Sequence, residues 1–553
     1  MLTETRIPAF AGILFILSLA VIFLFVNLGD IKLWQDEAET ALLGRSVIKY
    51  GIPKAWDGKN LISSLNGADF NKNFIWTWHP WAQAYLAAFS FSLFGESTFS
   101  SRLPFAFAGL LTIFFLYLLS LKLTNDYKIA LLSSFFLTIS LQFILYSRQC
   151  RYYSLLALSS VFIVYSFCKL KTRTGIILFI LSSILLFHSN FLPFFPTLFG
   201  LFIFLIISKK QRGEIKLFLF SSVIISFLTI PWLIYARGVS QGVSLLSKGG
   251  GPSFIAQEYD LLKIVNENAF PLIIILFAVY FLLKKNTAHP EISQLLLIII
   301  ISNLLFLPYI SYTQKIIGMR YAVGLLPLFS FLSALVIKTL FDYKKWLGIF
   351  IFIILVLTNI LNNLPNIIFK TANLTLNEKT NTEDLKLEFK KMLLGKIIYS
   401  DFLYELTHSY KGPVDGIAEF MNKYGNKEDA VLTNYESAPI LFYTNLNIAY
   451  VISNKPEFYN SIPSHEYDRI IEKELPDYVY TLKKVNWIIQ RTNYSNRLFN
   501  TDEILKEMEK KGHRIRRYEI DSPDLPWNNR EDIRYHKFKS VENYPKVVIY
   551  KVD

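Results

Sequence analysis

Long apolar runs alternate with short polar segments over roughly the first two thirds of the chain. The runs lie at about 8–28, 81–94, 103–121, 128–146, 152–170, 174–190, 194–208, 214–236, 270–283, 291–313, 320–338 and 344–364. An α-helix of about 20 apolar residues crosses the roughly 30 Å of hydrocarbon in a bilayer, with all its backbone groups bonded internally. The pattern therefore predicts an all-α polytopic membrane bundle.

The positive charges between these runs predict the orientation of the bundle. Cytoplasmic loops are enriched in Lys and Arg. The loops with this signal contain Lys169, Lys171, Arg173, Lys209, Lys210, Arg212, Lys216, Lys284, Lys285, Lys338, Lys344 and Lys345. If all of them lie inside, and the N-terminal span also starts inside, residues 29–102 must begin and end outside. The 81–94 run then becomes a helix in the outer interface, and about eleven transmembrane helices remain.

The composition changes at residue 366, and we divide the chain into a transmembrane domain (1–365) and a soluble domain (366–553). Short β-rich runs at 430–432, 448–452, 486–490 and 546–552 predict strands, and 502–511 predicts a helix that ends at Gly512. This indicates a C-terminal α/β domain. Because the last span ends outside, we expect the domain to be extracytoplasmic.

Composition excludes some classes of protein. The 553 residues are 52% hydrophobic and 16% aromatic, which fits a membrane protein. The net charge of +14 comes largely from short loops and the tail, so it indicates contact with anionic lipid or phosphate and not with nucleic acid. Cys150 and Cys168 lie at opposite ends of one predicted span, too far apart for a disulfide.

The unusual polar residues collect on the predicted outer side. They are Asp36, Glu37, His79, Arg148, Arg151, His188, Lys315, Arg320 and Tyr321, together with the loop 237–269. Ionisable groups near the membrane are costly, so they indicate a site; the alternative is that the arginines reach to lipid phosphates. The glycines at 249–251 suit either a flexible flap or an inert linker.

Several stretches resemble the GT-C superfamily of glycosyltransferases that use polyprenyl-phosphate sugars. The similarity is to the protein O-mannosyltransferases, the aminoarabinose transferases and the RgtA-like group. The stretches are L-W-Q-D-E-A (33–38), W-H-P-W (78–81), F-G-E-S (94–97), R-L-P (102–104), Y-S-R-Q-C-R-Y-Y (146–153) and R-Y before Pro327. Three positions depart from the family pattern: Glu39 replaces an Arg of the aminoarabinose branch, Gln149 replaces a common acid, and Trp81 replaces a Pro.

The resemblance implies a role for each candidate residue. Asp36 would be the general base that takes the acceptor's proton, and Glu37 would assist it or orient the loop. The donor phosphate would be bound by Arg148, Arg151, Arg320, Lys315 and His79, with a hydrogen bond from Tyr321. His79 and His188 could instead hold a divalent metal, and the alternative for each is a structural role.

The function indicated is inverting transfer of a monosaccharide from a polyprenyl-phosphate donor to a hydroxyl of lipid A or core, protein or a lipid-linked glycan. We expect a monomer in the cytoplasmic membrane, with the donor seated near the 81–94 helix. The alternatives are an undecaprenyl-diphosphate glycan polymerase or ligase, and a non-enzymatic transporter or receptor. Transport is disfavoured because transporters place polar groups at the midplane, whereas here they lie on one face.

Overall fold

The computed structural model describes most of the chain. The described residues are 6–63, 69–71, 73–208, 210–236, 254–287, 289–310, 318–365, 398–434, 437–444, 446–449, 484–491, 501–525, 533, 536 and 544–553.

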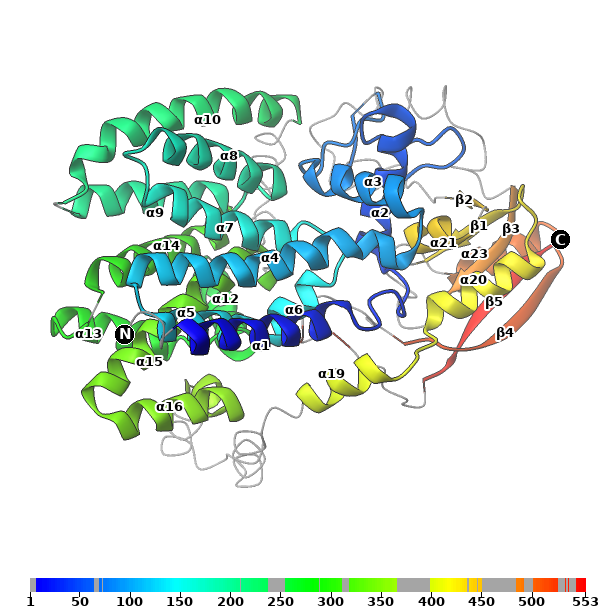
Figure 1. Ribbon diagram of the computed structural model, residues 1–553. Coiled ribbons are helices and arrows are strands. Elements are labelled where there is room, and N and C mark those ends of the chain that lie inside the picture. Colours follow the sequence, from blue (N-terminus) through cyan, green and yellow to red (C-terminus); the bar gives the residue numbers. More distant parts are fainter. Residues whose placement is uncertain are drawn as a thin grey trace.

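A bundle of apolar helices forms one end of the molecule (Figure 1). It contains α1 (Arg6–Phe25), α4 (Thr98–Thr124), α5 (Tyr127–Thr138), α6 (Leu141–Ser147), α7 (Tyr153–Phe167), α8 (Arg173–Ser189), α9 (Phe194–Ile207), α10 (Ile215–Tyr235), α12 (Phe254–Asn268), α13 (Ile273–Leu283), α14 (Pro290–Ile310), α15 (Leu326–Tyr343) and α16 (Lys345–Leu357). Within the described residues, five helices are long and apolar enough to cross a membrane, or up to seven if each bent pair is one span. The protein is therefore a multi-pass membrane protein, and the figure of eleven spans stays a prediction because α7, α8, α9 and α16 are shorter.

The two bent pairs have local causes. Helices α5 and α6 meet at 66°, and the Ser140 side chain accepts a hydrogen bond from the Phe143 amide at the start of α6. Helices α12 and α13 meet at 94° across Pro271, which has no amide hydrogen to continue a helix. Residues 254–268 of the loop expected at 237–269 are thus the helix α12, and its glycine-rich part lies outside the described residues.

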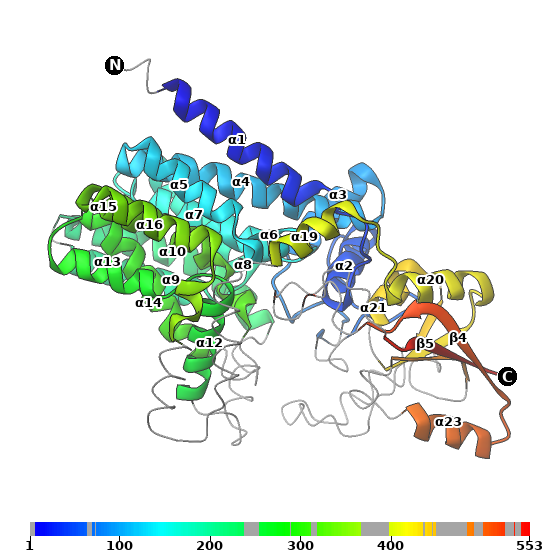
Figure 2. The ribbon, with the colours of Figure 1, turned by 90° about the horizontal axis from the view of Figure 1, so that it is seen from below.

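Helices α2 (Gln35–Tyr50) and α3 (Ala82–Phe94) lie between the bundle and the C-terminal sheet (Figure 2). They pack closely because small residues face each other: a Cβ added at Gly44 would lie 2.9 Å from the Cβ of Ala87. The helix predicted at 81–94 is confirmed as α3. Its position in the outer interface stays a prediction.

The C-terminal region contains a five-stranded sheet in the order β2-β1-β3-β5-β4. The strands are β1 (Ala430–Thr433), β2 (Asn447–Ala449), β3 (Val485–Gln490), β4 (Ile515–Pro523) and β5 (Lys546–Val552), accompanied by α19 (Ile398–Thr407), α20 (Pro413–Tyr424), α21 (Ser437–Tyr443) and α23 (Thr501–Lys510). Strands β1, β2 and β3 are parallel, whereas β5 is antiparallel to β3 and β4. Strands are present at all four predicted places, although residues 450–452 of the run predicted at 448–452 lie outside the described residues. Gly512 follows α23 with a φ of 89°. Strand β4 was missed because Arg516, Arg517 and Glu519 interrupt any apolar run.

The sheet shares a hydrophobic core with the N-terminal part of the chain. One cluster of buried side chains includes Leu33 and Ala38 near the start of α2, Phe91 of α3, Phe442 of α21 and Trp487 of β3. The predicted boundary at 365/366 adjoins residues 366–397, outside the described residues, and stays a prediction.

Candidate active site

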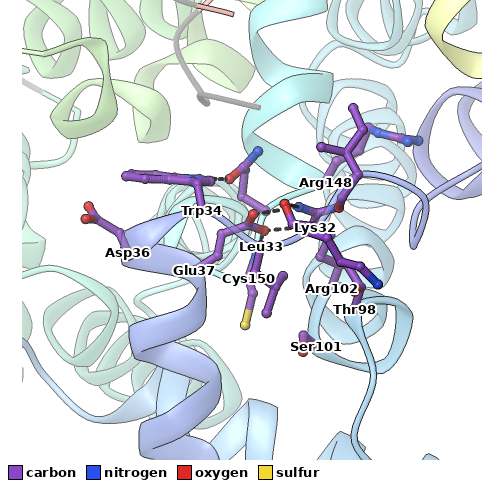
Figure 3. Close-up of polar contacts among 12 residues, drawn as sticks. Lys32, Leu33, Trp34, Asp36, Glu37, Thr98, Ser101, Arg102, Arg148 and Cys150 are labelled. Atoms are coloured by element: carbon purple, nitrogen blue, oxygen red, sulfur yellow. Dashed lines mark hydrogen bonds and ion pairs between the residues drawn. The ribbon is translucent and has the colours of Figure 1, made fainter. Parts of the chain in front are cut away.

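The start of α2 carries three acids, Asp36, Glu37 and Glu39, on two sides of the helix. Asp36 and Glu37 lie near the helix N-terminus, where the helix dipole favours negative charge. Asp36 and Glu39 are three positions apart and share a face, whereas Glu37 is rotated by about 100°. Figure 3 shows the Asp36 and Glu37 carboxylates pointing away from each other. The two adjacent acids therefore have different partners.

Glu37 is fully buried and forms a bidentate pair with Arg102 of α4. Its Oε1 accepts from Arg102 Nε at 2.8 Å and its Oε2 from Nη2 at 2.6 Å, and Oε1 also accepts from the Cys150 amide at 2.7 Å. Arg102 Nη1 donates to the carbonyls of Leu28 and Ile31 at 2.9 and 2.8 Å. This network (Figure 3) ties together α4, the segment before α2 and the turn after α6.

Asp36 faces two arginines from distant parts of the sequence. Its Oδ2 lies 3.5 Å from Arg151 Nη2 and 3.9 Å from Arg320 Nη1. The side chains of Asp36 and Arg320 are 24% and 31% exposed, whereas that of Arg151 is 3% exposed. Asp36 is therefore the acid of the first turn that a ligand can reach, and it lies next to two cations.

Arg151 is held from several sides. Its Nη1 donates to the Asp36 carbonyl at 3.2 Å and to Thr40 Oγ1 at 3.1 Å, and lies 3.5 Å from Glu39 Oε1. Among the described residues, its buried Nε has no hydrogen-bond partner. The guanidinium is thus fixed by α2 and keeps one N–H available to a further acceptor.

His79 lies beside Arg151, with 3.4 Å between His79 Nε2 and Arg151 Nη2. Its ring contacts those of Trp76, Trp78 and Tyr152. Burial, followed by the charges of Arg151 and Arg320, holds the pKa of His79 well below its usual 6.5. The ring is therefore neutral at pH 7, and its buried Nδ1 has no hydrogen-bond partner in the described part of the chain.

Arg148 and Gln149 extend from the same turn as Arg151 but contact other elements. Arg148 donates to the carbonyls of Phe23, Val26 and Asn27 at 2.9, 3.0 and 3.3 Å, which places its guanidinium at the C-terminal end of α1. Gln149 accepts a hydrogen bond from Trp34 Nε1 at 2.5 Å. Of the two arginines expected in this turn, the structure brings Arg151 to Asp36.

The other candidate residues are placed as follows. Tyr321 is buried, with the Arg320 guanidinium 5.1 Å from the centre of its ring. His188, near the end of α8, packs against Phe187 and Trp232. Lys315 lies outside the described residues.

The described residues do not fit a divalent metal site. No group of three or more His, Cys, Asp or Glu side chains is close enough among them to hold a metal ion. His79 also faces Arg151, and a second cation there would be repelled. Its environment suits an anion better than a metal.

Two residues of the site had no role in the sequence prediction. Glu39 contacts Arg151, and the spacing of three from Asp36 was the signal that both acids share a helix face. Arg102 pairs with Glu37, although the sequence showed it only as part of the R-L-P stretch.

Comparison with known proteins gives a match to one family model and similarity in fold to solved structures. Residues 78–235 match the family model described as dolichyl-phosphate-mannose-protein mannosyltransferase. The fold is similar to that of ArnT from Cupriavidus metallidurans in the apo state, with a TM-score of 0.55 and 11% identity over 98% of both chains. It is also similar to ArnT bound to undecaprenyl phosphate, with a TM-score of 0.56 and 10% identity over 97% of both chains.

A weaker structural similarity is to the oligosaccharyltransferase AglB from Archaeoglobus fulgidus in complex with an inhibitory peptide and a dolichol-phosphate. The TM-score is 0.46 and the identity 12%, over 88% of this chain and 69% of AglB. No curated protein matches the chain by sequence.

The helical bundle and the small C-terminal sheet have the fold of ArnT, and the cluster of Asp36, Arg151 and Arg320 lies within that fold. The family match overlaps His79 and Arg151, and the ArnT fold extends over nearly the whole chain. The chain therefore matches the mannosyltransferase family over residues 78–235, and its similarity to ArnT over the rest of the chain is one of fold.

Proposed function

We propose that the protein transfers a monosaccharide from a polyprenyl-phosphate donor to a hydroxyl group on the outer side of the cytoplasmic membrane, with inversion at the anomeric carbon. The observation that carries the proposal is the position of the accessible Asp36 carboxylate, within 4 Å of both Arg151 and Arg320. One acid and two cations meet the two needs of the reaction, a base for the acceptor and positive charge for the leaving phosphate. The ArnT structure with undecaprenyl phosphate supports this type of donor.

In the reaction, the acceptor oxygen attacks the anomeric carbon as its proton moves to the Asp36 carboxylate. The bond between that carbon and the phosphate oxygen breaks, and the electron pair leaves on the polyprenyl phosphate. Arg320 is the more exposed arginine, so its guanidinium can turn from Asp36 to the phosphate. Arg151 Nε and neutral His79 supply further hydrogen-bond donors at the same place.

Two residues expected at the site receive other roles in this proposal. Both oxygens of Glu37 are bonded to Arg102, so we assign it to positioning and leave proton transfer to Asp36. Both Nη atoms of Arg148 are bonded to carbonyls at the end of α1, so we leave it out of the phosphate site.

The sheet and α2 would then lie on the outer side of the membrane, with the donor chain near α3. Several apolar side chains on α3 are exposed and would face lipid; Phe89 is 62% exposed and Leu93 is 59% exposed. This placement follows from the positive charge of the opposite loops.

Asp36→Asn tests the proposal. We expect transfer to fall by at least about 100-fold, in the range for loss of a general base, while the purified protein still binds undecaprenyl phosphate. Transfer is measured by mass spectrometry of envelope glycans in cells without the gene, complemented by each variant. Glu96→Gln, which alters an exposed acid paired with Arg45, is the control. Full glycan transfer by Asp36→Asn would refute the proposed role of Asp36.

A further inference from the structure

Helix α21 of the C-terminal region packs directly against the segment that leads into Asp36. Ala438 donates its amide hydrogen to Gln35 Oε1 at 3.1 Å, and Gln35 immediately precedes Asp36. Tyr443, at the end of α21, accepts a hydrogen bond from the Leu33 amide at 3.0 Å. Residues more than 400 positions apart in the sequence thus meet beside the proposed base.

The Tyr443 side chain links three parts of the molecule. Its hydroxyl is 2.7 Å from Thr98 Oγ1, at the start of α4, in addition to its bond with Leu33. The Lys32 ammonium lies 4.7 Å from the centre of its ring. The phenol therefore holds residues 32–33 against α4, close to the Glu37–Arg102 pair that fixes the other side of the same segment.

Further contacts join α2 and the loop after it to the C-terminal region. Arg45 of α2 donates to the Phe442 carbonyl at 3.4 Å and lies over the Phe442 ring. Asn60 bonds to both the Leu446 carbonyl and the Ile448 amide, at 3.1 and 2.8 Å. Strand β2, which contains Ile448, is therefore joined to the loop after α2.

We propose that the C-terminal domain positions the proposed general base, and that the Tyr443 hydroxyl is the contact that does so. Two anchors hold the segment before Asp36: Arg102 from the bundle bonds the Leu28 and Ile31 carbonyls, and Tyr443 from the soluble domain bonds the Leu33 amide. A shift of about 1 Å in a catalytic group can reduce the rate about 100-fold, so the second anchor has a direct consequence for transfer. Tyr443 is a positioning residue in this reaction. The inference rests on the proposed function.

Tyr443→Phe removes the hydroxyl and keeps the ring over Lys32. The matched control is Tyr550→Phe, which removes the bond from the Tyr550 hydroxyl to Gln490 inside the sheet, away from α2. The first measurement is hydrogen exchange of the 31–38 peptide in nanodiscs, which does not depend on any activity. We expect exchange at Leu33 to accelerate at least fivefold in Tyr443→Phe and to stay unchanged in Tyr550→Phe.

The second measurement is glycan transfer. We expect the kcat of Tyr443→Phe to fall about tenfold, with binding of undecaprenyl phosphate and the thermal midpoint equal to those of Tyr550→Phe. Unchanged exchange at Leu33, or the same kcat in both variants, would overturn the role of Tyr443. Faster exchange together with full transfer by Asp36→Asn would instead show that the anchor exists and that Asp36 is not the base. Faster exchange with no transfer by the wild-type protein would show that the anchor exists and that the proposed function is wrong.

Discussion

Glu37 and Arg102 form the most completely buried ion pair near the site among the described residues, with side chains 0% and 4% exposed. Such a pair gains little over an apolar substitute, but removing one partner leaves an uncompensated buried charge. The Arg45–Glu96 pair is nearby in the fold, has side chains 33% and 40% exposed, and is solvated. The two pairs therefore allow the contribution of a buried ion pair to stability to be compared with that of an exposed one.

Glu37→Gln should destabilise the protein by about 3 kcal/mol, because Arg102 keeps its charge without the carboxylate. Glu96→Gln should cost less than about 1 kcal/mol, since its partner remains in water. Unfolding of the purified variants in the same detergent measures both. An equal loss of unfolding free energy in the two variants would show that burial does not make the Glu37–Arg102 pair more important for stability.

His79 provides a prediction for pH. Its pKa in the folded protein lies below 6.5, whereas the unfolded chain has the ordinary value of about 6.5. Between these two values the unfolded state binds more protons, so acidification through this window favours unfolding. The contribution of neutral His79 is fully present above about pH 6.5.

The wild-type protein should therefore lose more thermal stability between pH 7 and pH 5 than His79→Gln, which cannot take up that proton. Thermal unfolding at several pH values gives the difference. Tyr550→Phe, which removes no histidine, is the control and should follow the wild-type profile. Parallel pH profiles for His79→Gln and the wild type would contradict the prediction.

Sequence reasoning gave part of this site and not the rest. Asp36, His79, Arg151 and Arg320 were all named from composition and motif, and the structure brings them together. Arg148 and Arg151 could not be distinguished, because the directions of side chains in the turn between α6 and α7 depend on tertiary packing. Glu39 was seen only as a departure from a family pattern, although it shares a helix face and an arginine with Asp36.

Among the elements, α4 and α6 make a contact that controls the turn carrying Arg151. A Cβ at Gly109 of α4 would lie 2.7 Å from the Cβ of Ser147, the last residue of α6. Ser147 precedes Arg151 by four positions, so a displaced α6 moves the cation beside Asp36. Apolar periodicity predicted the helices here, but the spacing between them depends on the absence of one methyl group.

Gly109→Ala should reduce transfer about tenfold by shifting this turn. The double variant Gly109→Ala with Ser147→Gly removes the opposing Cβ and should recover most of the activity. Gly200→Ala crowds Ile299 in the α9–α14 contact, with its new Cβ 3.1 Å from the Ile299 Cα, and is the control away from the site. An equal loss in Gly200→Ala, or no recovery in the double variant, would exclude the proposed mechanism.

At the scale of the whole molecule, the two ends of the bundle differ in their charged residues. Lysines of the loops predicted to be cytoplasmic pair with acids at the starts of α10 and α14: Lys171 with Glu214 at 3.3 Å and Lys210 with Glu291 at 2.5 Å. The α9–α10 connection, which includes Lys210, lies at the end of the bundle away from the sheet (Figure 1). The site and the sheet lie toward the opposite end, and their position outside the cytoplasm stays a prediction from the positive-inside pattern.

Cysteine labelling of membrane vesicles tests this orientation. In a Cys168→Ala background, the remaining Cys150 is fully buried and should not react with a membrane-impermeant maleimide. Lys510→Cys, on the exposed end of α23, should be labelled in right-side-out vesicles, and Lys171→Cys only in inside-out vesicles. Labelling of both positions from the same side would contradict the orientation and remove the argument that places Asp36 outside. The opposite pattern would put the sheet and the site in the cytoplasm, where the outer-leaflet reaction proposed here could not occur.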